Sequence, residues 1–429
     1  MKPEKLTAIF RSFESRNFQL FFFGQGISLI GTWITQVATI WLVYRLTHSV
    51  LLLGLVGFAS QFPSFFMSPF AGLFVDRYNR HRILIITQVL SMVQSLALAA
   101  LALTGKADIF TIIILSIFQG LVNAFDVPAR QSFVMEMVEK KEHLGNAIAL
   151  NSSLFNGARL IGPAIAGLLL AAVGEGICFL IDGVSYIAVI YSLLAMHLKP
   201  RKIYPTNTRP LQQLKDGFVY AFGFPPIRSI LLLLALVSFA AMPYTILVPV
   251  FVTDILKGNS QTLGFLMAGS GLGAFAGAIY LSSRQTVRGL GKIIALAPAL
   301  LGIGLIAFSL SRNFWISFLI MPIIGCGMIL QVASSNTFLQ TIVEDDKRGR
   351  VMSLFTMSFM GTVPLGNLAG GTLANYIGAP NTLILGGICC IAGSFVFYKQ
   401  LPTLKPFIVP IYTNLGIISE LPSTDLPTR

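Results

Sequence analysis

Long apolar stretches, separated by short polar ones, dominate the hydropathy pattern of this chain. A helix needs about 20 apolar residues to cross a bilayer, and twelve stretches approach or exceed that length. The stretches are rich in Gly, Ser and Thr, which let membrane helices approach one another closely. The predicted spans are residues 18–44, 50–75, 83–104, 109–127, 145–173, 177–197, 227–253, 262–283, 290–311, 313–337, 349–376 and 379–400. The pattern therefore predicts an all-α integral membrane protein with about twelve transmembrane helices.

A longer polar stretch divides the twelve spans into two sets of six. We expect five parts: an N-terminal segment 1–17, a bundle 18–197, a linker 198–226, a second bundle 227–400 and a tail 401–429. The five prolines of the tail predict irregular structure there.

The two halves also resemble each other in sequence. Residues 131–150 align without gaps on residues 336–355, and Gly167 matches Gly371 at nearly the same offset. Two six-span halves in the same orientation are typical of transporters built from parallel repeats, with the substrate site between the halves.

Composition and charge agree with a membrane protein. The 429 residues are 55% hydrophobic and 11% charged, with a net charge of +13, whereas soluble chains carry roughly 25% charged residues. If the N-terminus is cytoplasmic, 25 Lys and Arg residues lie on the inner side and four on the outer side. This bias predicts cytoplasmic termini and explains the basic charge without nucleic acid.

No pattern of catalytic or cofactor-binding residues is present. The four histidines and four cysteines lack metal-ligand spacing, and the chain has neither a P-loop nor a G-x-S-x-G elbow. We therefore expect no enzyme activity, no cofactor and no metal.

The loop after the second span reads Gly72-Leu-Phe-Val-Asp76-Arg77-Tyr-Asn-Arg80. It resembles the cytoplasmic signature of the major facilitator superfamily. The resemblance implies a gate in which charge pairs form in one state and break in another. Asp126 and Arg130, four residues apart, are spaced for a helical ion pair at the same gate.

The fifth span contains Arg159, Gly162 and Pro163 in a glycine-proline motif similar to that of antiporters in this superfamily. Together with Phe125-Asp-Val-Pro-Ala-Arg130, it resembles the branch of enterobactin exporters and macrolide efflux proteins. This implies proton-coupled efflux from a bacterial inner membrane. One position departs from drug–proton antiporters, because Ser116 stands where many have a coupling Arg.

Two charges inside spans are candidates for coupling, because intramembrane charge is expensive. Arg159 lies near the middle of the fifth span, and Asp182 lies within the sixth. Arg159 could attract an anion, pair with Asp182 or brace backbone carbonyls.

The superfamily's architecture implies that spans one, four, seven and ten line the cavity. The candidate substrate-binding residues are the polar side chains of these spans: Gln25, Thr32, Gln36, Gln119, Asn123, Tyr244, Gln331 and Asn336. A largely apolar cavity with few polar groups suits amphipathic ligands.

The sequence therefore predicts a monomeric secondary exporter, driven by protons, of a siderophore- or macrolide-like compound. Two alternatives remain: an importer of a small organic anion, and a non-transporting scaffold of the same fold.

Overall fold

The computed structural model of the chain describes residues 11–138, 141–197, 210–284 and 286–417. The residues within these ranges form helices and no strand. A few helical side chains, those of Asp76 and Arg159 among them, lie outside the described part.

The first half contains η1 (Arg11–Glu14), α2 (Arg16–Thr47), α3 (Val50–Arg77), α4 (Arg80–Leu103), α5 (Ile109–Met137), η2 (Lys141–His143) and α6 (Leu144–Leu194). Helix α7 (Pro210–Gly223) follows. The second half contains α8 (Pro225–Ala241), α9 (Tyr244–Val250), η3 (Phe251–Ile255), α10 (Ser260–Ser283), α11 (Leu290–Leu310), α12 (Phe314–Ile342), α13 (Asp345–Thr356), η4 (Met357–Gly361), α14 (Thr362–Ile377) and α15 (Ala379–Asn414).

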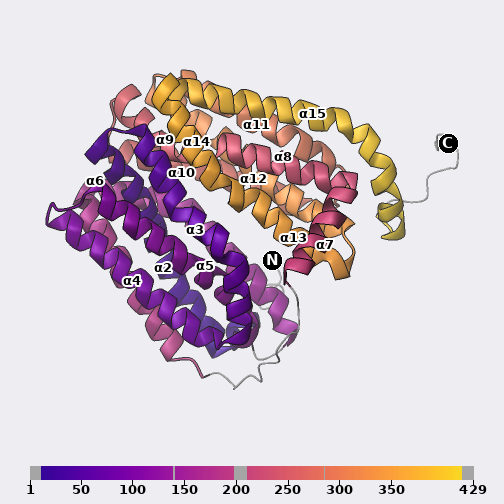
Figure 1. The fold of residues 1–429 in the computed structure, drawn as a ribbon, viewed down its shortest axis with the longest axis horizontal. Coiled ribbons are helices and arrows are strands. Elements are labelled where there is room, and N and C mark those ends of the chain that lie inside the picture. Colours follow the sequence, from indigo (N-terminus) through magenta and orange to yellow (C-terminus); the bar gives the residue numbers. More distant parts are fainter. Residues whose placement is uncertain (1–10, 139–140, 198–209, 285, 418–429) are drawn as a thin grey trace, which may run out of the picture.

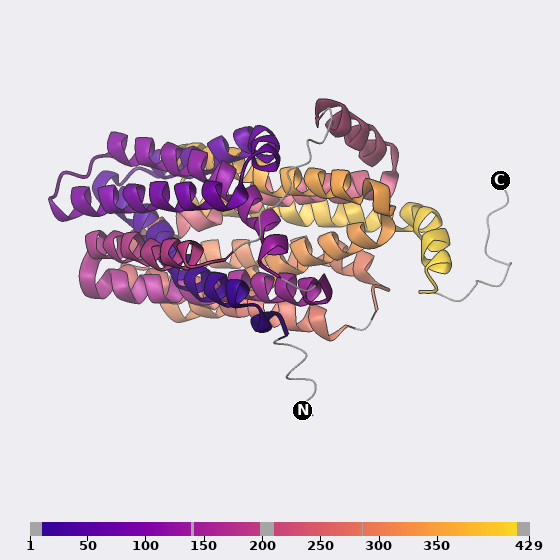
Figure 2. The ribbon, with the colours of Figure 1, turned by 90° about the horizontal axis from the view of Figure 1, so that it is seen from below.

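These helices form two bundles that lie side by side (Figure 1). The first bundle contains α2 to α6, the second contains α8 to α15, and their long helices run in a common direction (Figure 2). We call the end where α2 begins the terminal end, and the end where α2 turns into α3 the distal end. A compact apolar cluster that includes Phe18, Phe133 and Met137 fills the terminal end of the first bundle.

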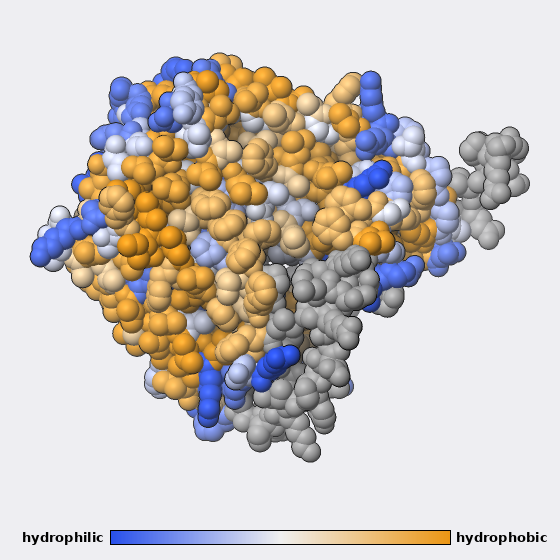
Figure 3. All heavy atoms as spheres, viewed as in Figure 1, coloured by the Kyte–Doolittle hydropathy of each residue, from blue (hydrophilic) through white to orange (hydrophobic). Residues whose placement is uncertain are grey.

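The surface of both bundles is apolar. Apolar residues cover most of the face shown in Figure 3, and polar ones gather toward its edges. Large side chains such as Leu319 and Trp315 are about 70% exposed. Exposing them to water would be unfavourable, whereas lipid solvates apolar side chains. Eleven stretches of the described chain are long and apolar enough to cross a membrane. The protein is an integral membrane protein.

Helix α6 counts as one of the eleven stretches, so the number twelve stays a prediction. It breaks at Gly174, whose backbone (φ 77°, ψ 174°) suits only glycine. Its two segments both pack against α2, since Gly162 meets Trp33 and Gly31 meets Asp182. Gly378 has similar angles between α14 and α15, and it lies 204 residues after Gly174. The two halves therefore turn at equivalent glycines, as parallel repeats should.

The prediction of an irregular tail is wrong for residues 401–414. Helix α15 continues through Pro402, Pro406 and Pro410 to Asn414. Prolines four residues apart lie on one side of a helix, so the missing backbone bonds fall along a single stripe. Tyr412, 7% exposed, packs its ring near Phe338 of α12, and this contact holds the last turns on the second bundle.

Candidate functional site

The two bundles are in backbone contact at their distal halves, through two pairs of glycines. In the first pair, α6 crosses α10, and a Cβ on Gly264 would lie 2.5 Å from the Cα of Gly167. In the second pair, α3 crosses α14, and a Cβ on Gly371 would lie 2.6 Å from the Cα of Gly54. Real Cβ atoms do not approach so closely, so each crossing requires glycine.

The two crossings are related by the internal repeat. Gly167 matches Gly371 at an offset of 204, and α3 of the first bundle corresponds to α10 of the second. Each bundle therefore contributes both kinds of helix to the closure. We call Gly54, Gly167, Gly264 and Gly371 the distal closure.

A hydrogen bond adds to the distal closure. The Tyr44 hydroxyl of α2 donates to the Asp254 carboxylate of η3 over 2.5 Å. Tyr44 is 2% exposed, and the His48 ring packs edge-on against it. The bond connects the two bundles through side chains, beside the backbone crossings.

The glycine-proline motif lies where α6 packs on α2. A Cβ on Gly162 would lie 2.5 Å from the Cβ of Trp33, and Pro163 is buried. The motif therefore lets two helices of the first bundle approach, five residues before the Gly167 crossing. Arg159 lies on the same segment, and its side chain is outside the described part.

The predicted gate residues of the loop after α3 lie at the terminal end. Arg80 pairs with Glu136 of α5 over 3.1 Å. Arg77 is exposed, and a Cβ on Gly72 would meet nothing within 4 Å. The Asp76 side chain is not described.

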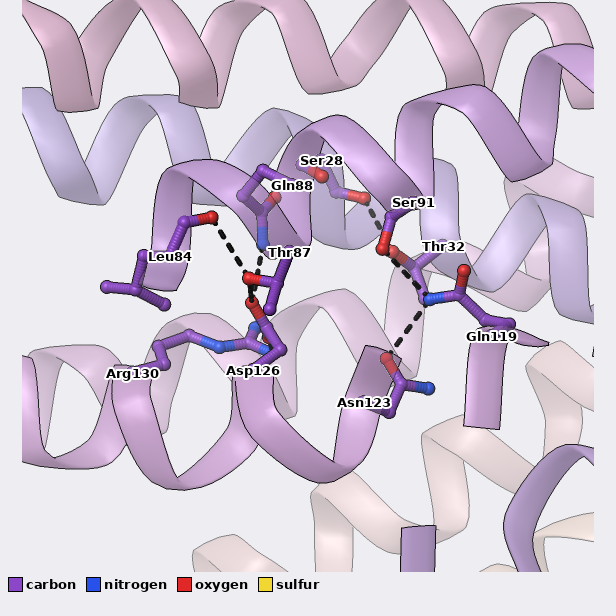
Figure 4. Close-up of polar contacts among 10 residues, drawn as sticks. All are labelled: Ser28, Thr32, Leu84, Thr87, Gln88, Ser91, Gln119, Asn123, Asp126 and Arg130. Carbon is purple, nitrogen blue, oxygen red and sulfur yellow. Dashed lines mark hydrogen bonds and ion pairs between the residues drawn. The ribbon is translucent and has the colours of Figure 1, made fainter. Parts of the chain in front are cut away.

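Asp126 is the centre of a buried polar network (Figure 4). It is 3% exposed and pairs with Arg130, one turn further along α5. Its Oδ1 accepts hydrogen bonds from Thr87 (2.9 Å) and Gln88 (2.7 Å) of α4. The spacing predicted the ion pair, but the two donors from α4 were not foreseen.

A second polar group lies closer to the middle of the first bundle. The Gln119 amide donates to Ser91 and to Asn123, each over 3.1 Å. Thr32 of α2, whose hydroxyl donates to the Ser28 carbonyl, lies near the same group (Figure 4). The structure therefore brings together Thr32, Gln119 and Asn123 from the predicted binding set.

Of the other predicted binding residues, Gln36 is exposed one turn beyond Thr32 on α2, whereas Gln25 and Gln331 are buried. Tyr244 bonds Ser270 within the second bundle, beside a cavity of about 10 Å³ that holds at most one water. Asn336 accepts a hydrogen bond from Gln340.

Asp182 is the most enclosed of the candidates. It is 1% exposed, and its Oδ2 accepts hydrogen bonds from Thr35 and Ser95, both over 2.7 Å. The described residues contain no group of three or more His, Cys, Asp or Glu that could hold a metal ion.

The chain resembles known transporters along nearly its whole length. Residues 7–407 match the family model described as "Transmembrane secretion effector". The chain belongs to the major facilitator superfamily. It is 29% identical over 382 residues to the staphyloferrin A transporter of Staphylococcus aureus, covering 88% of this chain and 94% of that one. It is 22% identical over 375 residues to macrolide efflux protein A of Streptococcus pyogenes, covering 86% and 92%.

Among solved structures, a bacterial homolog of the human lysosomal transporter Spinster, inward-facing and unoccupied, has a TM-score of 0.70 at 14% identity. The alignment covers 95% of this chain and 99% of that chain, so the two share the major facilitator fold. This superfamily consists of transporters, and the protein is therefore a transporter and not an enzyme.

Several residues of this major facilitator protein escaped the sequence analysis. Glu136 and Asp254 pair with residues far away in the chain, and no local pattern identifies those partners. The buried polar face of α4 could have been predicted from the sequence, because its polar residues recur at helical spacing. They are Thr87, Gln88, Ser91, Gln94 and Ser95.

Proposed function

We propose that the protein is a secondary exporter that exchanges protons for a small amphipathic compound of siderophore or macrolide type. The relatives named for staphyloferrin A transport and macrolide efflux support the substrate class. The sequence contains no nucleotide-binding P-loop, so an ion gradient is the natural energy source.

The terminal end faces the cytoplasm in this proposal. The bias of Lys and Arg toward the loops of that end supports this orientation. The distal end then faces outward, and the membrane is a bacterial plasma membrane, as in the bacterial relatives.

The distal closure is the observation that carries the proposal. Two repeat-related backbone crossings and the Tyr44–Asp254 bond all close the distal end. Glycine crossings hold helices by packing alone, so they can separate without leaving buried polar groups unpaired. Rocking the bundles about the substrate would open the distal end, which is alternating access.

The proposed substrate contacts lie on α2 and α5. Thr32 and Gln36 are exposed, and Gln119 and Asn123 are half-buried, so a ligand between the bundles could reach all four. Few polar groups on apolar helices suit an amphipathic compound. Arg159 is proposed to assist coupling or to attract an anionic group of the substrate.

Export from intact cells tests this function. Wild type, Arg159→Ala and Lys106→Ala are expressed in a bacterium that lacks its own siderophore and macrolide exporters. Lys106 is an exposed residue of the distal α4–α5 loop and serves as the control for loss of a positive charge. Extracellular staphyloferrin A and intracellular erythromycin, a macrolide, are measured with and without a protonophore.

We expect wild type and Lys106→Ala to export at least one of these compounds. A protonophore should abolish this export, and Arg159→Ala should reduce it about tenfold or more, the effect of losing one functional contact of about 1.4 kcal/mol. Uptake of an organic anion in place of export would favour the importer. If the levels of both compounds are the same in cells with wild type and with empty vector, although the protein is in the membrane, neither compound is a substrate.

A further inference from the structure

Asp182 is a carboxyl group enclosed in the membrane-spanning part of the first bundle. It follows the Gly174 turn by eight residues, or about 12 Å at about 1.5 Å per residue. Asp182 therefore lies within the apolar membrane-spanning stretch Ile161–Leu194. Its Oδ2 accepts hydrogen bonds from two hydroxyls, and its Oδ1 has no hydrogen-bond partner among the described residues.

No described cation neutralises this carboxyl. The described ion pairs of the protein all lie elsewhere. The helices packed around Asp182 contribute Thr35 from α2 and Ser95 from α4. On α6 itself, the titratable neighbours one turn away are Cys178 and Tyr186.

An ionised carboxylate in such a place is costly. A buried charge needs a partner charge and a full set of hydrogen bonds, and without them the group becomes neutral by taking up a proton. A neutral carboxyl at Asp182 keeps its proton and can donate a hydrogen bond to one of its two hydroxyl neighbours. We propose that Asp182 is the binding site for the coupling proton, an assignment that rests on the proposed exporter function.

Polar groups lead from Asp182 toward the terminal end. Tyr186 is buried one turn beyond Asp182 on α6, and it lies beside the hydroxyls of Thr32 and Ser91. Ser91 accepts a hydrogen bond from Gln119, as Figure 4 shows. These side chains provide a path for the proton between Asp182 and Asp126, parallel to α4.

The site is coupled to the packing of α2 on α6. A Cβ on Gly31 would lie 2.6 Å from Asp182 Oδ1 and 3.1 Å from its Cα. The backbone of α2 therefore covers the carboxyl group directly. An ionised Asp182 would attract water and oppose this packing, whereas a neutral one is compatible with it. Because α2 also carries Tyr44, whose bond to Asp254 joins the bundles, protonation favours the closed distal end and loss of the proton favours opening.

Infrared difference spectra of the full-length protein in lipid nanodiscs test the site directly, without a substrate. The variants are Asp182→Asn, which keeps the shape and an acceptor oxygen, and Asp108→Asn. Asp108 caps the distal start of α5, where hydrogen bonds from Thr111 hold the pKa of its exposed carboxyl below the usual range. Asparagine is an equally good cap.

Above about pH 5 ordinary Asp and Glu carboxyls are mostly ionised. In that range we expect wild type and Asp108→Asn to show the carbonyl band of a protonated carboxylic acid, which disappears as the pH is raised further. The band should be missing from this range in Asp182→Asn. A wild-type spectrum without a titrating band, or a band that persists in Asp182→Asn, would overturn the assignment.

Spin-label distances test the coupling to the distal closure. Labels are placed at exposed distal positions of the two bundles, through Lys106→Cys and Arg312→Cys, in a chain whose four native cysteines are replaced by alanine. In wild type and Asp108→Asn, raising the pH should increase the fraction of long distances. In Asp182→Asn the short distances should persist at all pH values, and an unchanged pH response there would overturn the coupling.

The path is tested in proteoliposomes with an imposed pH gradient and erythromycin as the probe. Ser91→Ala should slow proton-driven erythromycin transport several-fold while the carbonyl band of Asp182 remains. An unchanged transport rate would show that Ser91 is not part of the path. If the wild type shows the titrating band and transports neither erythromycin nor staphyloferrin A, the proposed substrates fail and the proton site stands.

Discussion

The Tyr44 hydroxyl and the Asp254 carboxylate are 210 positions apart in the chain and 2.5 Å apart in the structure. Their hydrogen bond joins α2 of the first bundle to η3 of the second, at the end where the glycine crossings also lie. Transport by alternating access requires this bond to break and re-form in every cycle.

Replacing Tyr44 by phenylalanine should weaken the closed distal end and keep the aromatic packing. One hydrogen bond has a net value of about 1 kcal/mol, which changes an equilibrium about fivefold. We expect the long distances between labels at positions 106 and 312 to become about five times more populated relative to the short ones. An unchanged distance distribution would mean that the bond does not contribute to closure.

Replacing Gly167 by alanine should disrupt the crossing of α6 and α10. The new methyl group would collide with the backbone of Gly264, which cannot move as a side chain could, and overpacking costs about 1–3 kcal/mol. We expect the rate of export to fall about tenfold. Gly145→Ala, in the same helix with nothing within 4 Å of the new Cβ, should stay within about twofold of wild type. Equal rates for the two variants would contradict the crossing as a tight contact.

The Asp126–Arg130 pair should behave as a buried ion pair. Arg130→Ala leaves Asp126 with hydrogen bonds from Thr87 and Gln88 only, and an uncompensated buried charge costs about 3–5 kcal/mol. The double variant Asp126→Asn with Arg130→Ala should regain part of that loss, because the charge is gone as well. Thermal unfolding of wild type, Arg130→Ala, Asp126→Asn and the double variant measures the interaction energy of the pair. A double variant less stable than Arg130→Ala would contradict this account.

The end of α15 should contribute to stability despite its prolines. Tyr412→Ala removes a buried ring that packs near Phe338, and such truncations cost about 3–5 kcal/mol in well-packed sites. Leu415→Ala, at a position 55% exposed, should change stability by no more than about 0.5 kcal/mol. The two melting temperatures should differ by several degrees, and equal values would show that the end of α15 is not packed.

The membrane-spanning helices could be predicted from the sequence because lipid requires long apolar segments and little else. Their internal symmetry was visible for the same reason, since glycines that set helix crossings recur at a fixed offset, as Gly167 and Gly371 do. Crossing partners such as Gly264 could not be identified, because a glycine in an apolar helix does not specify which neighbour it faces.

Polar contacts within the bundles were only partly predictable. The Asp126–Arg130 pair follows from helical spacing, whereas the contacts of Asp182 with Thr35 and Ser95 depend on how three helices pack. The tail was mispredicted because proline was judged by its local preference alone. The contact of Tyr412 with the second bundle outweighs that preference.

Transport in inside-out membrane vesicles tests the central claim most directly, because the direction of movement and the proton gradient are both imposed. Vesicles that contain the wild-type protein are given an acidic interior, and labelled erythromycin and staphyloferrin A are added outside. The account predicts that at least one compound accumulates inside, and that collapsing the gradient or replacing Asp182 by asparagine abolishes the accumulation. Accumulation that is the same with and without the gradient, or that matches vesicles without the protein, would contradict a proton-driven exporter.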